Sequence, residues 1–354
     1  KKARSHAGRS GGGLRLEKNT IGDKVHPNAA GAEKMASKWF AALKPLLTGD
    51  GAELPADVSI RTLPEREEDA LAAASEVLVY KTVDGLDLEM HVFLPEDAGE
   101  GTLRPGVLYI HGGGWKGGDP AVHAFESLYL SRLGMVTATI RYRLLGNGNT
   151  KYATGSSPAD CLADAKSAMR FFRSHAKEFA MDPNRIAAGG SSAGGHLAAA
   201  LNTVQGYDDP ADDRSVSAQA NALILLYPAF DLINGWKNGA RQCARSGIDL
   251  KSFSPATLAG KTFPPTMILV GNLDPVSPPA SNRDFLARMQ AAGVSVELLT
   301  YSGKAHKLFE RRKSDPHFRS YLIHSSRFFQ KLEWIPKSPQ PALPEVEYTR
   351  VVVP

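Results

Sequence analysis

The pentapeptide Gly190-Ser191-Ser192-Ala193-Gly194 has the form G-x-S-x-G, in which a serine occupies a sharp turn with its hydroxyl exposed. Glycine is favoured on either side of such a turn because a side chain there would meet crowded backbone. Residues 185–189 are typical of a short buried strand, and residues 194–201 are typical of a helix whose small side chains allow close packing. The order of strand, turn and helix predicts that Ser192 is an activated nucleophile.

A second motif argues against the alternative of a plain glycine-rich turn. About eighty residues upstream, the segment 111–115 reads His-Gly-Gly-Gly-Trp and follows 105–110, an apolar run long enough for a central strand. Acyl transfer passes through a tetrahedral oxyanion, which fixed N–H donors stabilise by roughly 3 kcal/mol each. We expect the N–H groups of Gly113, Gly114 and Ala193 to form this oxyanion hole.

A serine nucleophile needs a general base, and the base needs a carboxylate to orient it. Two strand-and-loop units downstream of the pentapeptide supply candidates. Asp274 lies in the loop after the predicted strand 266–271, and His306 lies in the loop after the predicted strand 294–301. This order of serine, acid and histidine matches the order in which a G-x-S-x-G serine finds its partners. The sequence therefore predicts Ser192, Asp274 and His306 as a catalytic triad.

Other residues compete for the same roles. Asp231, which follows the apolar run 222–228, is the main alternative acid, and Asp274 is favoured over it. His111 is expected to brace the glycine-rich loop, and His196 is expected to be a packed core residue. The remaining rivals fall on helix-like segments and do not follow a strand as His306 does: His123, His175, His317 and His324.

The elements that must position these side chains alternate along the chain. Residues 77–93 alternate in polarity around Asp84-Gly85, which predicts a hairpin. From Gly106 onward, strand-like and helix-like stretches alternate at a spacing that implies parallel crossovers. The predicted fold class is α/β, with a mostly parallel central sheet flanked by helices. Helices are expected near residues 120–133, 159–180, 194–204, 281–292 and 316–333.

The segment 229–264 interrupts this rhythm with Gly, Ser and charged residues. Insertions at the carboxyl edge of a parallel sheet overhang the site, so we interpret this segment as a small lid or pocket wall. It carries Trp236, and Trp115 follows the predicted oxyanion loop. Both tryptophans are candidate substrate-binding residues, with plain packing as the alternative.

Charge and composition narrow the classes of partner. The 354-residue chain has a formal net charge of +5, but its basic residues are dispersed, and the densest run, 311–313, is interpreted as a solvated helix end. No basic stripe with interleaved aromatics and no zinc-spaced cysteine set points to nucleic acid. No apolar run approaches the ~20 residues of a membrane helix.

The sequence predicts neither a disulfide framework nor a cofactor. Cys161 and Cys243 are the only cysteines, so a disulfide framework is not expected, and whether they pair is left open. Chemistry of the Ser-His-Asp type requires no metal and no cofactor. The sequence gives no oligomeric state.

Taken together, these motifs resemble the esterase/lipase branch of the α/β-hydrolases related to hormone-sensitive lipase. Residues 160–170 and 182–186 are similar, more narrowly, to the bifunctional feruloyl and acetylxylan esterase group. Ser191 is a departure, because the lipase branch usually has Asp before the nucleophile. The resemblance covers residues from about 75 to 333, and its motifs are 111–115, Tyr142-Arg143-Leu144, 190–195, Asp274-Pro275 and His306.

This resemblance implies an α/β-hydrolase fold and acyl-enzyme chemistry on an ester. It further implies that the substrate carries acetyl or feruloyl groups on plant polysaccharides and that the protein is secreted or periplasmic in a bacterium. The alternatives are a generalist short-chain carboxylesterase, a formamidase, and a catalytically silent carbohydrate-binding protein of the same fold.

The sequence also predicts a division of the chain. Residues 1–56 resemble the last catalytic block of an SGNH (GDSL-type) esterase followed by a linker, with Asp23 and His26 in the places of acid and base. The chain opens without a methionine, so we interpret this block as the remnant of a tandem esterase. Residues 57–335 are assigned to the catalytic domain, and the Pro-rich residues 336–354 to an extended tail.

Overall fold

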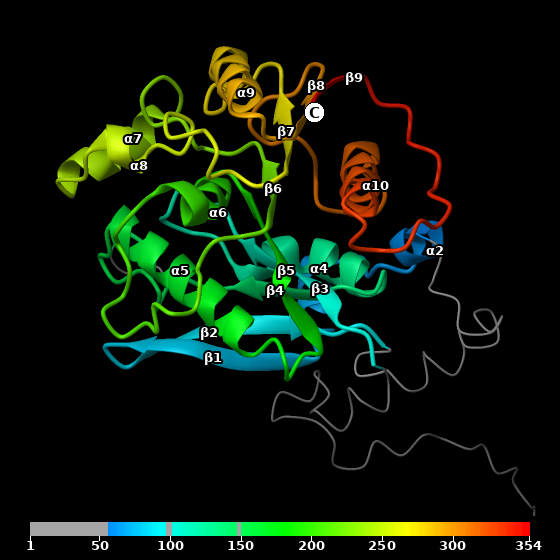
Figure 1. Cartoon of the computed structure of the whole chain (residues 1–354), viewed down its shortest axis with the longest axis horizontal. Helices are drawn as coiled ribbons and strands as arrows, with labels where there is room; N and C mark the ends of the chain where they lie inside the picture. Colours follow the sequence, from blue (N-terminus) through cyan, green and yellow to red (C-terminus); the bar gives the residue numbers. More distant parts are fainter. Residues whose placement is uncertain (1–55, 97–100, 147–149) are drawn as a thin grey trace, which may run out of the picture. The chain divides into compact units, whose positions relative to one another are not determined.

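A nine-stranded sheet forms the centre of the computed structural model, which describes residues 56–96, 101–146 and 150–354 (Figure 1). The strands lie in the order β1-β2-β4-β3-β5-β6-β7-β8-β9. Their bounds are β1 Glu76–Val83, β2 Leu86–Phe93, β3 Arg104–Ile110, β4 Val136–Ile140, β5 Met181–Ser191, β6 Ala222–Leu226, β7 Thr266–Gly271, β8 Val296–Tyr301 and β9 Tyr348–Val353.

The predicted hairpin is the antiparallel pair of β1 and β2. Asp84 and Gly85 join the two strands with φ of 50° and 77°, the positive values that a tight hairpin turn requires. β2 pairs antiparallel with β4, whereas β3 to β8 form one parallel block. A mostly parallel sheet with the strand order 1-2-4-3-5-6-7-8 is the α/β-hydrolase arrangement, and the predicted fold class is confirmed.

Helices cover both faces of the sheet. One face packs against α5, α6 and α9, and the other packs against α3, α4 and α10. The helices are α2 Ala56–Arg61, α3 Glu67–Leu71, the 3-10 turn η1 Pro120–His123, α4 Ala124–Ser131, α5 Pro158–Ser174, α6 Ala193–Thr203, α7 Lys237–Arg245, α8 Leu250–Phe253, α9 Pro279–Ala292 and α10 Pro316–Lys331.

Alternation along the central strand β3 divides the core into two clusters. Successive side chains of a strand point to opposite faces. Leu108 and Ile110 therefore pack with α5 and α6, whereas Val107 and Tyr109 pack with α4 and α10. All four side chains are fully buried. A strand buried on both faces has a continuous run of apolar residues, and this run is why β3 can be predicted from the sequence.

The predicted tail contains one more strand than expected. Residues 348–353 form β9, which pairs antiparallel with β8 from Tyr348 opposite Tyr301 to Val353 opposite Val296. The described residues therefore form one compact unit that includes the tail. Asp23 and His26 of the predicted SGNH block lie outside the described residues.

The two cysteines are both buried and free. Cys161 lies in α5, and Cys243 lies in α7. The open possibility of a disulfide is thus not realised in this structure.

Within the described ranges, no helix combines the length and the apolar character that a membrane crossing needs.

Candidate active site

The nucleophile elbow lies between the end of β5 and the start of α6. Ser192 has φ of 54° and ψ of −118°, a backbone conformation that is strained for any residue except glycine. A Cβ on Gly194 would collide with the carbonyl oxygen of Ile110, so glycine is required for β3 to lie this close. The strain and the close approach together hold the Ser192 side chain at the carboxyl edge of the sheet.

Ser192, His306 and Asp274 form a continuous chain of hydrogen bonds. Ser192 Oγ lies 2.7 Å from His306 Nε2. His306 Nδ1 lies 3.1 Å and 3.0 Å from the two carboxylate oxygens of Asp274. With Nδ1–H donating to the carboxylate, Nε2 of the neutral imidazole accepts the serine proton. The structure thus brings together all three residues of the predicted triad.

The Asp274 carboxylate is fixed by its own loop. Its side chain is fully buried, and the N–H groups of Val276 and Ser277 donate to Oδ1 at 2.7 Å and 3.0 Å. The alternative acid, Asp231, instead accepts from the N–H groups of the two loop residues that follow Leu232, both at 2.9 Å. Its carboxylate makes no bond to His306. The geometry therefore favours Asp274 over Asp231.

The glycine-rich loop after β3 lies directly beside the elbow. A Cβ on Gly112 would lie 2.7 Å from the Ser191 carbonyl oxygen and 3.2 Å from Ser192 Cβ. Gly113 and Gly114 have φ of 110° and 63°, both in the left-handed region that favours glycine. The loop can lie this close to the elbow only because position 112 lacks a side chain.

The predicted oxyanion donors have no competing acceptor within the described residues. The N–H groups of Gly113 and Gly114 make no hydrogen bond there. Ala193 is the first residue of α6, where N–H groups have no intrahelical partner. The three N–H groups are therefore available to an anionic oxygen next to Ser192.

Two histidines near the elbow have structural partners, as the sequence predicts. His111 Nδ1 bonds to Gly112 O at 2.8 Å, and its ring stacks on Tyr142 with centroids 4.3 Å apart. His196 Nε2 bonds to Phe253 O at 2.8 Å. Burial lowers the pKa of each histidine to about 4, so both are neutral at physiological pH.

The two candidate substrate-binding tryptophans occupy different positions. Trp236 caps the start of α7, is 8% exposed, and lies 3.8 Å from the place of a Cβ on Gly114. Trp115 is fully buried behind it, with ring centroids 4.4 Å apart. Trp236 therefore borders the oxyanion loop with a little exposed surface, whereas Trp115 has none for a ligand to contact.

The predicted lid contains two short helices. α7 and α8 lie together at one side of the molecule, in yellow-green at the upper left of Figure 1. Exposed cations follow one face of α7 at four-residue spacing: Lys237, Arg241 and Arg245. The lid adjoins the oxyanion loop through the ring of Trp236, which lies beside Gly114, and the backbone N–H of Trp236 donates to Asp231 O at 2.7 Å.

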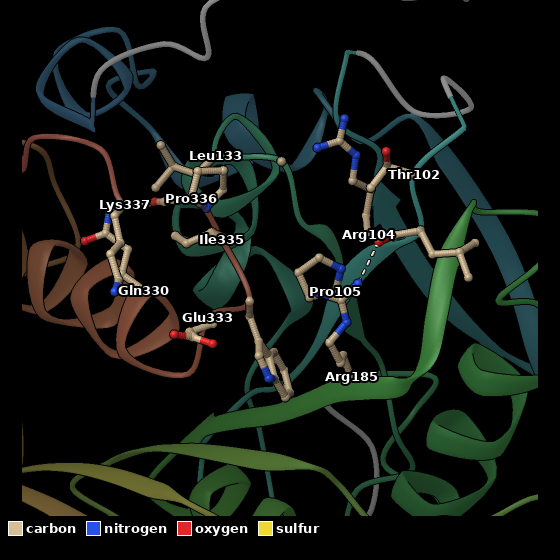
Figure 2. Close-up of a pocket in the computed structure, with 13 residues that line it drawn as sticks. Thr102, Arg104, Pro105, Leu133, Arg185, Gln330, Glu333, Ile335, Pro336 and Lys337 are labelled. Carbon is tan, nitrogen blue, oxygen red and sulfur yellow. Dashed lines mark hydrogen bonds between the residues drawn. The ribbon is translucent and has the colours of Figure 1, made fainter.

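A pocket of about 420 Å³ lies elsewhere, beside the amino-terminal ends of β3 and β5 (Figure 2). Its walls include Arg104, Arg185 and Trp334, and Arg185 Nη2 donates to Leu103 O at 2.8 Å. Ligands of parallel sheets bind at the carboxyl ends of the strands, where Ser192 lies. This pocket is therefore separate from the candidate active site.

Among the described side chains, no group of three or more His, Cys, Asp and Glu is placed to hold a metal ion.

Comparison with known proteins agrees with this geometry. A sequence model of the BD-FAE family matches residues 90–289. The solved structure of Thermogutta terrifontis Est2, a thermophilic esterase with propionate bound, is 34% identical, with a TM-score of 0.69 over 76% of this chain and 98% of that chain. The same esterase phosphorylated by paraoxon is 33% identical, with a TM-score of 0.68 over 76% of this chain and 97% of that chain.

Curated relatives are more distant. The probable isoprenylcysteine alpha-carbonyl methylesterase ICMEL1 of Arabidopsis thaliana is 27% identical over 223 residues, which is 57% of this chain and 45% of the relative. The arylacetamide deacetylase of Oryctolagus cuniculus is 30% identical over 172 residues, which is 47% of this chain and 40% of the relative. The chain thus spans about half the length of the curated relatives it matches, or less.

Proposed function

Because this chain belongs to the BD-FAE family, we propose that it is a serine carboxylic-ester hydrolase with Ser192 as nucleophile, His306 as general base and Asp274 as orienting acid. One observation carries the proposal. The hydrogen bonds run without a break from the Ser192 hydroxyl through both nitrogens of His306 to the Asp274 carboxylate. A base within about 2.6–3.2 Å of the proton it abstracts meets the first requirement of general base catalysis.

In the first half of the reaction, Ser192 Oγ attacks the ester carbonyl carbon while His306 Nε2 takes the hydroxyl proton. The carbonyl oxygen becomes an oxyanion against the N–H groups of Gly113, Gly114 and Ala193. The bond to the alcohol oxygen then breaks, and His306 transfers the proton taken from Ser192 to that oxygen. Ser192 is left as an acyl ester.

In the second half, a water molecule attacks the acyl carbon while His306 Nε2 accepts one of its protons. The second tetrahedral oxyanion forms in the same place. When the bond to Ser192 Oγ breaks, His306 protonates that oxygen, and the carboxylic acid leaves. Asp274 stabilises the imidazolium in both halves.

For the substrate, we propose acetyl or feruloyl esters of plant polysaccharides. Family membership supports this class, together with the partly exposed Trp236 beside the oxyanion loop, since an indole can contact a sugar or an aromatic ring. A generalist short-chain carboxylesterase is the second candidate, and the propionate complex of the similar Thermogutta esterase favours it. A silent binding protein has no need of an aligned triad.

The test is acid release from acetylated xylan, methyl ferulate and 4-nitrophenyl acetate by the wild type and by Ser192→Ala. Ser246→Ala, at an exposed serine, is the matched control. Release of acetate or ferulate that disappears only in Ser192→Ala supports the full proposal, whereas turnover of the aryl ester alone supports the generalist. Absence of turnover from all three, with Ser192 also unlabelled by paraoxon in a mass spectrum, contradicts hydrolase function.

A further inference from the structure

A second serine, histidine and carboxylate array lies behind the nucleophile elbow. Ser191 Oγ is 3.2 Å from His123 Nε2, and His123 Nδ1 is 3.2 Å from Glu126 Oε1. Ser191 is 2% exposed, and the other two residues are fully buried. The array contains Ser191, the residue at which this chain departs from the lipase pattern.

The array continues to the candidate general base. Arg311 Nε donates to Glu126 Oε1 at 3.2 Å, and Arg311 Nη1 donates to the Tyr227 hydroxyl at 3.1 Å. The Tyr227 ring meets the His306 imidazole edge to face, with centroids 5.2 Å apart and an interplanar angle of 77°. We call Ser191, His123, Glu126, Arg311 and Tyr227 the buried polar chain. It begins next to the nucleophile and ends against the base.

Arg311 corrects an interpretation made from the sequence. The run 311–313 was expected to be a solvated helix end, but the Arg311 side chain is only 10% exposed and lies between Glu126 and Tyr227. Arg312 is exposed, as expected. Arg311 follows His306 by five residues, so the loop that presents the base also supplies the cation of the buried polar chain.

The protonation states follow from these contacts. Burial lowers the pKa of His123, so its imidazole is neutral, with Nδ1–H donating to Glu126 and Nε2 accepting the Ser191 hydroxyl. Burial acts to raise the pKa of Glu126, but the Arg311 cation and the His123 bond outweigh it, and the pKa lies below its ordinary value. Glu126 and Arg311 are therefore a buried ion pair.

This ion pair is incompletely satisfied. Glu126 Oε2 and Arg311 Nη2 are buried without a hydrogen-bond partner among the described residues. Buried ion pairs of this kind contribute little to stability compared with apolar side chains of similar volume. Its place in a chain of contacts that runs from Ser191 to the ring beside His306 therefore needs an explanation other than fold stability.

The imidazole of His306 has a degree of freedom that its hydrogen bonds do not restrain. Asp274 and Ser192 bond to the two nitrogens, so the ring can still rock about the line that joins them. Tyr227 contacts the ring from the side and removes this freedom. Its own backbone has φ of 37°, a strained value, and its N–H donates to Leu269 O at 2.6 Å.

We propose that Arg311 is the positioning residue of the general base: anchored by Glu126, it holds the Tyr227 ring against His306. Glu126 is also hydrogen-bonded to His123, and His123 is hydrogen-bonded to Ser191, the residue before the nucleophile. This inference rests on the proposed hydrolase function. It has a kinetic consequence, because the acyl-enzyme lacks the Ser192 hydroxyl bond and His306 then depends more on Tyr227. Deacylation should be the more sensitive half of the reaction.

The primary test compares Arg311→Met with Arg312→Met, the same substitution at the exposed neighbour. With 4-nitrophenyl acetate we expect Arg311→Met to lower kcat by about 10- to 100-fold, because small misplacements of catalytic groups cost rates of this order. KM should fall by a similar factor, because slower deacylation lowers both constants and leaves kcat/KM less affected. A burst of nitrophenol should appear as the acyl-enzyme accumulates. Arg311→Lys should recover part of kcat, and Arg312→Met should match the wild type.

The pH profile of kcat/KM tells whether Arg311 acts on the general base partly through its charge or only by packing. The acid limb of kcat/KM reports the base of the free enzyme. Charged and titratable groups from several elements lie near Arg311: Glu126 from α4, His123 from η1, Tyr227 after β6, Glu67 from α3, Tyr109 from β3 and Tyr321 from α10. Arg311→Met removes a positive charge from this assembly and Glu126→Gln removes a negative one. We therefore expect the acid limbs of the two variants to move in opposite directions, to higher pH in Arg311→Met and to lower pH in Glu126→Gln.

Tyr227→Phe keeps the ring and removes only the hydroxyl that Arg311 bonds, so it tests whether this bond holds the ring against His306 even if Arg311→Met does not fold. We expect a several-fold loss of kcat with a detectable burst. Equal kcat in the Arg311 and Arg312 variants, or in Tyr227→Phe and the wild type, overturns the inference while Ser192-dependent hydrolysis stands. Unchanged acid limbs in both charge variants also overturn it. Loss of the proposed function is recognised separately, by a wild type that hydrolyses no ester.

Discussion

Ser192 Oγ and His306 Nε2 lie 2.7 Å apart, although 114 positions separate the two residues along the chain. The parallel sheet accounts for this approach. Ser192 follows β5, Asp274 lies in the loop after β7, and His306 lies in the loop after β8. All three therefore lie at the carboxyl edge of the sheet. Each crossover helix returns the chain to the opposite edge, and the acid and the base therefore reach the serine from consecutive strands.

The role of Asp274 can be separated from that of Asp231 by the same substitution at both sites. Asp274→Asn keeps the size of the side chain but disturbs the tautomer of His306, and kcat should fall by roughly 10³- to 10⁴-fold. Asp231→Asn should change kcat by less than tenfold, because Asp231 bonds only to backbone N–H groups of its own loop. Steady-state kinetics on 4-nitrophenyl acetate give the comparison. A larger loss in the Asp231 variant would reverse the assignment.

The oxyanion loop can be tested without altering a triad residue. In Gly112→Ala the new Cβ would lie 2.7 Å from the Ser191 carbonyl oxygen, so the loop must move away from the elbow. We expect kcat to fall by about 10²-fold, the order seen when one oxyanion donor is lost, with KM little changed. Gly117→Ala is the control in the same loop, since a Cβ there meets nothing within 4 Å. Equal activity of the two variants would contradict the placement of the oxyanion hole.

Glu67 should make the protein more stable in mild acid than in mild base. Partial burial raises the pKa of Glu67 to about 7, against the opposing Arg311 cation and with a smaller contribution from Glu126. Because the folded-state pKa is the higher one, the stabilisation is fully present below the unfolded value near 4.5 and is lost as the pH rises through about 7. Glu67 is partly exposed, so the loss is held to roughly 1–2 kcal/mol.

The measurement for Glu67 is urea unfolding of Glu67→Gln and the wild type between pH 4 and pH 9. The variant should be the more stable protein above pH 8, and its advantage should shrink as the pH falls toward 5. Glu68→Gln, at the exposed neighbour, should show no such trend. An advantage of Glu67→Gln that is independent of pH would rule out this linkage.

The two tryptophans should respond differently to truncation. Trp115→Ala removes a fully buried indole and should cost about 3–5 kcal/mol of unfolding free energy. Trp236→Ala removes a side chain that borders the oxyanion loop, and it should raise KM for polysaccharide or feruloyl esters more than for 4-nitrophenyl acetate. Denaturant unfolding and substrate-resolved kinetics distinguish the two effects. Equal KM changes across the substrates would assign Trp236 to packing.

The sequence predicts the residues whose roles depend on local pattern. Ser192 can be identified because the elbow needs small residues at fixed spacing, and Asp274 and His306 can be identified because each follows a mainly apolar strand. β9 was not predicted, because its four middle residues are exposed and a Pro-rich stretch precedes it. A strand on a sheet edge lacks the continuous apolar run that marks β3.

The buried polar chain could not be predicted for a different reason. Arg311, Arg312 and Lys313 are alike in type, and only the tertiary structure decides that the first turns inward to Glu126 while the second faces solvent. His123 was set aside as one of several helix-like histidines, because its partner Ser191 is distant in sequence and neutral. When only one charged residue of a basic run is buried, the sequence contains no repeating pattern that would identify it.

The two free cysteines make the lid and the core separately observable by thiol chemistry. Cys243 lies in α7 and Cys161 in α5, and burial raises the pKa of both thiols, that of Cys243 to about 12. A thiol reagent therefore reacts with either residue only after the surrounding structure opens. The labelling rate at Cys243 measures detachment of α7, and the rate at Cys161 measures opening of the layer that contains α5. Comparison of the two rates shows whether the lid moves independently of the core, with no cysteine introduced by mutation.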